Sequence, residues 1–529
     1  MLCGLCQIED TVADEHAEML KRAEQYITEM GDIEGLRLRY GKDKTFAVPI
    51  LTNCALAGLV DWKEVSPLPF ELACPPPRFY RFFKLSVVSY AIPALVAIGQ
   101  ARFFHRRPRN PLVRWLRQWA VEPSLRVLQR MQPASGGFLE AVPLTSFVVM
   151  SLASTGRVAH PVTKQGVEFL TESLRDDGTW PIDTNLATWT TTLSINALAA
   201  GGEDVSRLSC FRWLLDCQHR EIHPYTRATP GGWAWTDLSG GVPDVDDTSG
   251  ALLAIAAWSL TSTDVQHQHQ AREAAEAGIG WLLDLQNSDG GWPTFCRGWG
   301  TLPFDRSGSD LTAHALRALH VWRGEFPQLN ERISTAVRRG FDHLAKSQHV
   351  DGSWTPLWFG NQFHPVEENL VYGTARVLLA YRDYGSFDEQ PAKRGLAFLE
   401  RCQNADGGWG GGPVESENRH RSCRSSVEET AVALEAVLGS ACNQSPQDVI
   451  TKGITWLAEA ALAGRHCEPS PIGFYFAKLW YYEDLYPLIF TVAALGRAAC
   501  LLDESPKGPN AAAAEKSHLP QLNFEPRSN

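Results

Sequence analysis

The sequence lacks the patterns of a metalloprotein, of a secreted disulfide-rich protein and of a β-protein. Its 12 cysteines are scattered over 529 residues, and the pair Cys3 and Cys6 has no second pair or histidine set at zinc-ligand spacing. We therefore expect reduced, intracellular thiols, no metal site and no cofactor. Alternating β-branched runs between tight turns are scarce, which predicts an all-α fold. The polar first 40 residues contain no basic segment followed by an apolar core, so we expect no signal peptide.

Acidic residues are absent between Glu71 and Glu122, although the whole chain has a net charge of −11. Nine lysines and arginines lie in that stretch, so one region is strongly basic. These residues alternate with aliphatic runs rather than with polar groups that could meet phosphates. Nucleic acid is therefore not an expected partner.

The basic region also lacks an apolar run of the ~20 residues that a membrane-spanning helix needs. Residues 85–98 are apolar but fewer, and residues 112–121 place Trp115 and Trp119 four positions apart. This combination predicts a membrane-associating segment, about residues 78–131, that lies on a membrane surface without crossing it. A buried helix beside a solvated basic loop is the alternative interpretation.

A pattern of an amphipathic run, a Gln, an Asp-Gly turn and a Trp recurs roughly every 50 to 60 residues. Four of these turns end at Trp180 (without the Gln), Trp292, Trp354 and Trp409. A second apolar helix that opens with an acidic or polar residue and usually a Thr follows each turn, so each repeat is a helix pair. We assign the four tryptophans to the turns. Helix pairs can stack in an open solenoid or close into an α-barrel, and periodicity alone does not choose between them.

Three carboxylates crowd the start of one second helix, in the stretch PDVDDTSG. Crowded carboxylates raise one another's proton affinity, which favours keeping one as an acid. Asp247 and Thr248 occupy the position of Glu429 and Thr430 in a sister repeat, so a helix cap is the alternative role for Asp247. The sister repeats lack the upstream pair Asp244 and Asp246. We therefore expect the chemistry of this protein at that pair.

With these repeats and this acid motif, the sequence resembles the squalene–hopene cyclase family of class II terpene cyclases over roughly residues 20 to 500. GGWAW precedes the motif, and LQNSDGGW, DLTAHAL, DGSW, VYGT and QNADGGWG follow it in the family's order. The resemblance implies a double α-barrel (α/α toroid). Residues 1–185 would form an inserted second barrel, short at its N-terminus, and residues 186–502 the catalytic barrel. A tail of low apolar content, residues 503–529, is expected to be disordered.

The resemblance also implies the chemistry, which is protonation of a terminal alkene followed by ring closures through carbocations. Asp246 would be the proton donor, Asp244 and Asp247 supporting carboxylates, and Tyr372 a neighbour acting through ordered water. Aromatic faces would stabilise the cations without trapping them. The matching cavity positions are Trp189, Trp235, Phe295, Trp358, Tyr475, Phe476 and Tyr482.

One departure from the family concerns the partner of the acid. Bacterial members carry a His before a Pro-Phe pair, and here GTLPFD places Thr301 at or next to that position. A hydroxyl can hydrogen-bond a carboxyl but cannot carry positive charge, so Arg306 or ordered water would have to replace the His.

The sequence thus predicts an isomerase-type intramolecular transferase or lyase that cyclises squalene, or a related polyisoprenoid, to a hopanoid-like product. We expect it on the inner, cytoplasmic face of a membrane, as a peripheral (monotopic) protein that could form a homodimer. One alternative is a cyclase of a shorter prenyl diphosphate, and another is a non-catalytic isoprenoid-binding relative. A protein prenyltransferase is a third, but no Asp-x-Cys with a suitable downstream His is present to bind its zinc.

Overall fold

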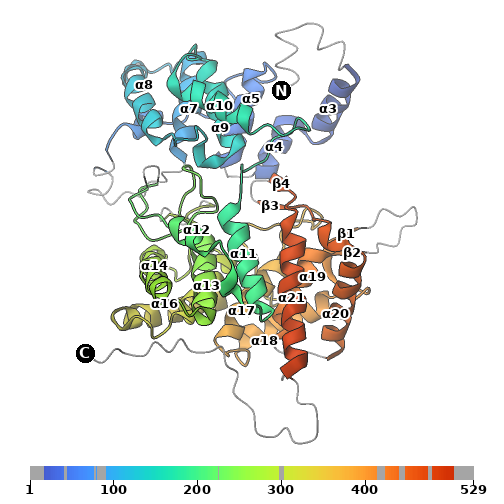
Figure 1. Cartoon of the computed structure of the whole chain (residues 1–529). Helices are drawn as coiled ribbons and strands as arrows, with labels where there is room; N and C mark the ends of the chain where they lie inside the picture. Colours follow the sequence, from blue (N-terminus) through green and yellow to red (C-terminus); the bar gives the residue numbers. More distant parts are fainter. Residues whose placement is uncertain are drawn as a thin grey trace, which may run out of the picture. The chain divides into compact units, whose positions relative to one another are not determined.

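The protein divides into two compact units. The computed structural model describes residues 17–40, 44–76, 79, 91–223, 226–296, 303–413, 423–439, 447–474 and 479–504. Unit 1 contains the chain up to Asn185 with the short segments Pro224–Arg227 and Leu238–Gly241. Unit 2 contains Leu186–His223, Ala228–Asp237 and the chain from Val242. Figure 1 shows both units as predominantly helical.

Unit 1 is a helical assembly around α7. Its helices are α3 (Ala17–Glu29), α4 (Asp32–Tyr40), α5 (Lys44–Leu56), η1 (Phe70–Ala73), α7 (Ile92–His105), α8 (Pro111–Met131), η3 (Phe138–Glu140), α9 (Val142–Ala153) and α10 (Pro161–Glu172). Helix α7 packs against α8, α9 and η1, and it buries Val96, Ala97 and Ile98 completely. For this half of the apolar segment 85–98, the buried-helix alternative is correct. Residues 81–90 lie outside the described residues.

Helix α8 presents the opposite picture. It begins at Pro111, after Asn110, whose side chain caps the backbone N–H groups of Leu112 and Val113. Leu112, Trp115, Leu116 and Trp119 are 76%, 71%, 41% and 59% exposed. Their spacing of three, four and seven residues places them on one face of the helix. Unit 1 therefore carries an exposed apolar stripe where the sequence places basic residues close by.

Unit 2 is a closed ring of helices. Its inner helices are α11 (Ala187–Ala200), α13 (Val245–Thr261), α15 (Ser309–Val321), α17 (Leu370–Asp383), α19 (Val427–Leu438) and α21 (Leu485–Glu504). Each packs on the next, and α21 closes the ring by packing against α11 (Figure 1). Length and composition alone would allow α21 to cross a membrane, yet it is a wall helix of the ring. The ring selects the α/α toroid over the open solenoid and confirms the predicted fold class.

A second set of helices covers the ring from outside. These are α12 (Phe211–Asp216), α14 (Val265–Leu285), α16 (Asn330–Ser347), α18 (Gln390–Cys402) and α20 (Gln447–Leu462), joined by the short helices η4 (Val205–Arg207), η5 (Pro327–Leu329) and η6 (Arg465–Cys467). Strands β1 (Trp409–Pro413) and β2 (Cys423–Ser426) form one antiparallel pair, and β3 (Ile472–Phe474) and β4 (Leu479–Tyr481) form another. The sheet content described is therefore limited to two small hairpins.

Side-chain hydrogen bonds explain the Gln and Trp of each turn. Gln286 donates from Nε2 to the carbonyls of Gly290 and Ala336 at 2.8 and 2.9 Å, which ties the turn to the next outer helix. Trp292 donates from Nε1 to the Leu282 carbonyl at 2.8 Å. The same bonds recur at Gln218 with Trp233, Gln348 with Trp354, and Gln403 with Trp409. These buried tryptophans build the wall of the ring and not its lumen.

Candidate active site

The acid motif lies at the N-terminal end of the inner helix α13. Asp244 is the N-cap, because its Oδ1 accepts the backbone N–H of Asp247 at 2.8 Å. The cap role considered for Asp247 is therefore wrong. Thr248 serves the turn, since its Oγ1 accepts the backbone N–H of Trp233 at 2.9 Å.

Asp244 and Asp247 form a buried pair, and each is 4% exposed. Burial raises the pKa of Asp244 to about 7, and hydrogen bonds from Asp247 counteract part of that rise. Burial and the charge of Asp244 raise the pKa of Asp247 well above its ordinary value. Asp247 therefore keeps its proton at neutral pH beside the capping carboxylate. The third carboxyl, Asp246, is the one that lines a cavity.

Asp246 has a histidine partner that the sequence motifs contained but to which we assigned no role. Its Oδ1 lies 2.9 Å from Nδ1 of His314, which stands on α15 in the quoted segment DLTAHAL. Burial lowers the pKa of His314, although the hydrogen bond and charge of Asp246 act to raise it. His314 is therefore neutral near pH 7. Thr301, where we expected a substitute for this histidine, lies outside the described residues.

Asp310 and Tyr372 line the same cavity as Asp246 and His314. Burial, and then the charge of Asp246, raise the pKa of Asp310 to about 7. Its Oδ1 accepts the backbone N–H of Leu357 at 2.9 Å. Tyr372 is 4% exposed, and burial raises the pKa of its phenol, so it stays neutral. The structure thus brings Asp246, His314, Asp310 and Tyr372 together from three inner helices.

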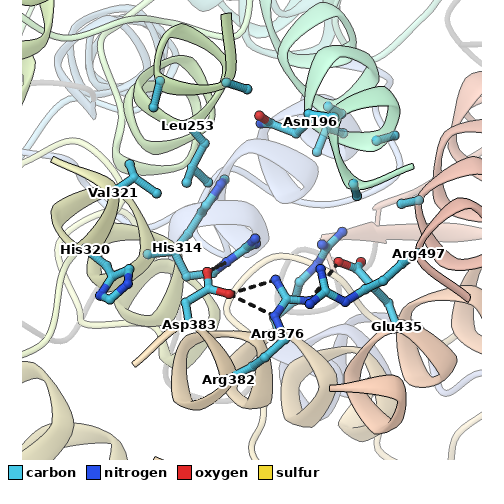
Figure 2. A pocket seen from close by; sticks show the side chains of 18 of the residues that line it. Asn196, Leu253, His314, His320, Val321, Arg376, Arg382, Asp383, Glu435 and Arg497 are labelled. Carbon is cyan, nitrogen blue, oxygen red and sulfur yellow. Dashed lines mark hydrogen bonds and ion pairs between the residues drawn. The ribbon is translucent and has the colours of Figure 1, made fainter. Parts of the chain in front are cut away.

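The cavity inside the ring has a volume of about 850 Å³ and is strongly charged (Figure 2). All six inner helices contribute to its lining. The charged and titratable lining residues are Asp246, Asp310, Glu325, Asp383, Glu435, Arg317, Arg323, Arg376, Arg382, Arg497, His314, His320 and Tyr372. The expected oily chamber walled by aromatic rings is therefore not what adjoins Asp246 on this side. The sequence pattern did not reveal this, because the cavity arginines come from α15, α17 and α21 and the chain directly after α15, and only the closed ring brings them together.

A chain of buried ion pairs lines the cavity, as Figure 2 shows in part. Asp383 accepts from Nε of Arg317 at 2.7 Å and from Arg382 at 2.8 Å. Arg382 also contacts Glu435 at 3.3 Å. Burial opposes ionisation of Asp383, but Arg382 and Arg317 outweigh it and hold the pKa of Asp383 well below its usual range. These pairs join α15, α17 and α19.

We call the end of the ring at which the inner helices begin the rim; it is formed by the segments that directly precede these helices. The predicted aromatic residues lie mainly at the rim. Trp189 lines the cavity, is 7% exposed and donates from Nε1 to the Tyr486 hydroxyl at 2.8 Å. Its ring meets His314 edge-on, with centroids 6.3 Å apart. The carbonyl of Trp235 accepts from the backbone N–H groups of Thr188 and Trp189, which places Trp235 on the rim at α11.

Phe295 and Trp358 belong to an aromatic cluster on the rim at α13. Phe304 links them, with ring centroids 4.9 Å from Phe295 and 5.1 Å from Trp358. Trp358 donates from Nε1 to Thr294 Oγ1 at 3.0 Å, and the Thr294 carbonyl accepts the N–H of Val245 at the start of α13. Neither Phe295 nor Trp358 lines the charged cavity. The acid motif thus stands where the aromatic rim meets that cavity.

The remaining predicted cavity residues are not in this arrangement. Tyr482 is 63% exposed and does not line the cavity, so its expected role is corrected: it follows the edge of the β3–β4 hairpin on the surface. Tyr475 and Phe476 lie outside the described residues. Three further aromatic residues, Phe304, Phe359 and Phe490, were not expected from the sequence. The ring centroid of Phe359 lies 4.6 Å from that of Tyr372.

The raised pKa of Asp310 predicts a pH-dependent stability. An unfolded carboxyl ionises near its ordinary pKa of 3.8, whereas the folded one ionises at about 7. The contribution of Asp310 is therefore full below pH 4 and is lost as the pH rises to 7. We expect Asp310→Asn to reduce the fall in the urea-unfolding midpoint between pH 5 and pH 7. An equal fall in wild type and variant would contradict the assignment.

Comparisons with known proteins identify the family and the fold. The family model "Squalene-hopene cyclase C-terminal domain" matches residues 185–500. The enfumafungin synthase of Hormonema carpetanum is 28% identical over 351 residues, which is 60% of this chain but 25% of that protein's length. The squalene–hopene cyclase of Bradyrhizobium diazoefficiens is 25% identical over 483 residues, 76% of this chain and 69% of the relative. The solved structure of ent-copalyl diphosphate synthase from Streptomyces platensis shares the fold, with a TM-score of 0.52, 17% identity and coverage of 89% of this chain and 92% of that one.

Proposed function

Because the chain belongs to the squalene–hopene cyclase family, we propose that it is a class II terpene cyclase that protonates squalene and closes it into a polycyclic, hopanoid-like triterpene. The observation that carries the proposal is the pair Asp246–His314, which stands where the aromatic rim meets the ring interior. Asp246 would be the acid, and the rim would hold the isoprenoid chain.

The contacts of Asp246 suggest different roles for its two carboxyl oxygens. With its hydrogen on Nδ1, His314 donates to Oδ1 and leaves Oδ2 to carry the transferable proton. When the O–H bond at Oδ2 breaks and a C–H bond forms at the terminal alkene carbon, the hydrogen bond from His314 supports the carboxylate left behind. His314 is neutral and keeps its own proton, so it does not compete as the donor.

Rim aromatics suit the cations that follow. Each ring face contributes about 0.5 to 2 kcal/mol of attraction to a nearby cation without offering a lone pair that would trap it. The cluster of Phe295, Phe304 and Trp358 supplies such faces next to the start of α13. Deprotonation or capture of the last cation would then release a neutral cyclic product. The proton released there, either from the cation itself or from the water that captures it, balances the one donated by Asp246.

Incubation of the detergent-solubilised protein with squalene in D₂O tests the proposal. We expect a cyclic triterpene, detected by mass spectrometry, that carries one non-exchangeable deuterium from the initiating proton transfer. A parallel incubation with geranylgeranyl diphosphate tests the shorter-substrate alternative. Cyclic product from that substrate alone would move the function to a diphosphate cyclase, and binding of squalene without product would favour a non-catalytic relative.

We further propose that the α8 stripe rests on the cytoplasmic face of a membrane, where the apolar substrate resides. Trp side chains suit the bilayer interface, and arginines nearby suit anionic headgroups. Replacing Trp115 and Trp119 together by Ser should weaken co-sedimentation with vesicles of anionic phospholipid by about a hundredfold or more, since burying one large apolar side chain contributes roughly 1.5–3 kcal/mol. Val350→Ser, which changes a 99% exposed residue of unit 2, is the control. Unchanged sedimentation of the Trp variant would reject the surface.

A further inference from the structure

One arginine of the cavity is held by aromatic rings and not by an acid. Arg376 lies on α17, four residues after Tyr372. Its guanidinium carbon is 4.9 Å from the centroid of the Tyr372 ring and 5.0 Å from that of Phe490 on α21. A guanidinium between two ring faces is a favourable cation–π arrangement, strengthened by burial. The stack therefore holds Arg376 and Tyr372 in one fixed relation.

Two other cavity arginines are held by acids. Arg317 and Arg382 form the ion pairs with Asp383 and Glu435 described above. Among the described residues, Arg376 forms no ion pair within 4.0 Å, and its Nη2 is buried without a hydrogen-bond partner. Burial lowers the pKa of Arg376, but Tyr372, Glu435 and Asp246 together outweigh it, so the net shift is upward and the side chain stays a cation.

The charge of Arg376 reaches the acid pair. It acts on Asp246 attractively and on His314 repulsively, and the second effect helps to lower the pKa of His314. A cation here favours the carboxylate form of Asp246 that remains after proton transfer, and it disfavours an imidazolium at His314. Both effects favour the state that follows protonation of the substrate.

We propose that Arg376 is a positioning residue for the reaction: clamped between Tyr372 and Phe490, it orients Tyr372 beside Asp246 and supplies the positive charge that stabilises the carboxylate left by proton donation. This inference rests on the proposed function.

The titratable and charged groups around Arg376 come from every neighbouring inner helix. They are Asp246 on α13, Asp310, His314 and Arg317 on α15, Tyr372, Arg382 and Asp383 on α17, Glu435 on α19, and Tyr486 and Arg497 on α21.

Steady-state kinetics with squalene test the role in turnover. Arg376→Gln should lower kcat by about tenfold or more and leave KM within about twofold, because the charge matters only once Asp246 has lost its proton. Arg376→Lys, which keeps the charge, should recover most of kcat. Arg338→Gln, an exposed residue on α16, is the control. A rise in KM with unchanged kcat, or equal loss in Gln and Lys variants, would overturn the proposal.

A second measurement needs no substrate and therefore separates this inference from the proposed function. The pKa of His314 can be followed by NMR of protein labelled at its histidine side chains, with the signal assigned through His314→Gln. Loss of the cation in Arg376→Gln should raise that pKa by roughly 0.5 to 1 unit, and Arg376→Lys should restore it. An unchanged pKa of His314 would reject the electrostatic role even if squalene is cyclised. A raised pKa without squalene turnover would retain it and reject only the substrate.

Discussion

Replacement of Asp246 by Asn should lower the rate of squalene cyclisation by at least about a thousandfold. An alkene is a very weak base, and an amide at position 246 has no acidic proton to transfer. Asp244 and Asp247 cannot substitute, because they are buried together and occupied as the helix cap and its partner. Product formation is measured by mass spectrometry at saturating squalene, on protein whose helical content is verified by circular dichroism.

Two controls make this outcome specific. Asp284→Asn alters an exposed carboxylate in a surface ion pair with Arg332 and should leave turnover unchanged. His314→Gln, which retains a hydrogen-bond donor beside Asp246, should reduce turnover less than Asp246→Asn does. If Asp246→Asn formed product at the wild-type rate, the assignment of the acid would be wrong.

Replacement of Asp383 by Asn should destabilise unit 2 by about 3 to 5 kcal/mol. Its carboxylate is 4% exposed and contacts both Arg317 and Arg382. An amide would leave two arginines on the cavity wall without their principal counter-charge. The expected observation is a lower urea midpoint at pH 7, followed by tryptophan fluorescence.

The effect of Asp383→Asn on stability can be checked in two ways, by its dependence on pH and by comparison with an exposed ion pair. Because the folded pKa of Asp383 is depressed, its stabilisation is present above the unfolded value and is lost only as the pH falls through the folded one. The cost of Asp383→Asn should therefore persist down to about pH 5. Asp284→Asn in the exposed pair should cost less than about 1 kcal/mol. Equal costs at the two sites would mean that the buried network contributes no more than a surface contact.

Several features of the site were readable from the sequence because they are local. A helix cap, an Asp-Gly turn and a Trp in that turn depend on neighbours within a few residues. The repeats can therefore be recognised directly in the amino-acid sequence. The excess of carboxylates before Thr248 pointed to the acid motif for the same reason. The closed ring also agrees with the expected toroid, although the periodicity alone left a solenoid open.

Other features depend on partners distant in the chain. His314 is 68 positions from Asp246, and no spacing rule connects them. Both α7 and α8 carry apolar residues, but most of those of α7 are buried whereas Leu112, Trp115 and Trp119 of α8 are exposed, and only packing decides which. Tyr482 matches a cavity position by resemblance to the family, but the chain after β4 leaves it in solvent.

By itself, then, the sequence determined the helix pairs, their turns, the family and the carboxyl group to test first. Tertiary structure alone decided which charges surround that carboxyl. Ring closure brings one face of each inner helix to a common interior, and there the cost of burying an unpaired charge makes Asp383 depend on Arg317, and Arg382 on Glu435, each from another repeat. The sequence pattern predicts which face of a helix is apolar. It does not predict which residue pairs with a buried charge, because that partner comes close only when the ring closes.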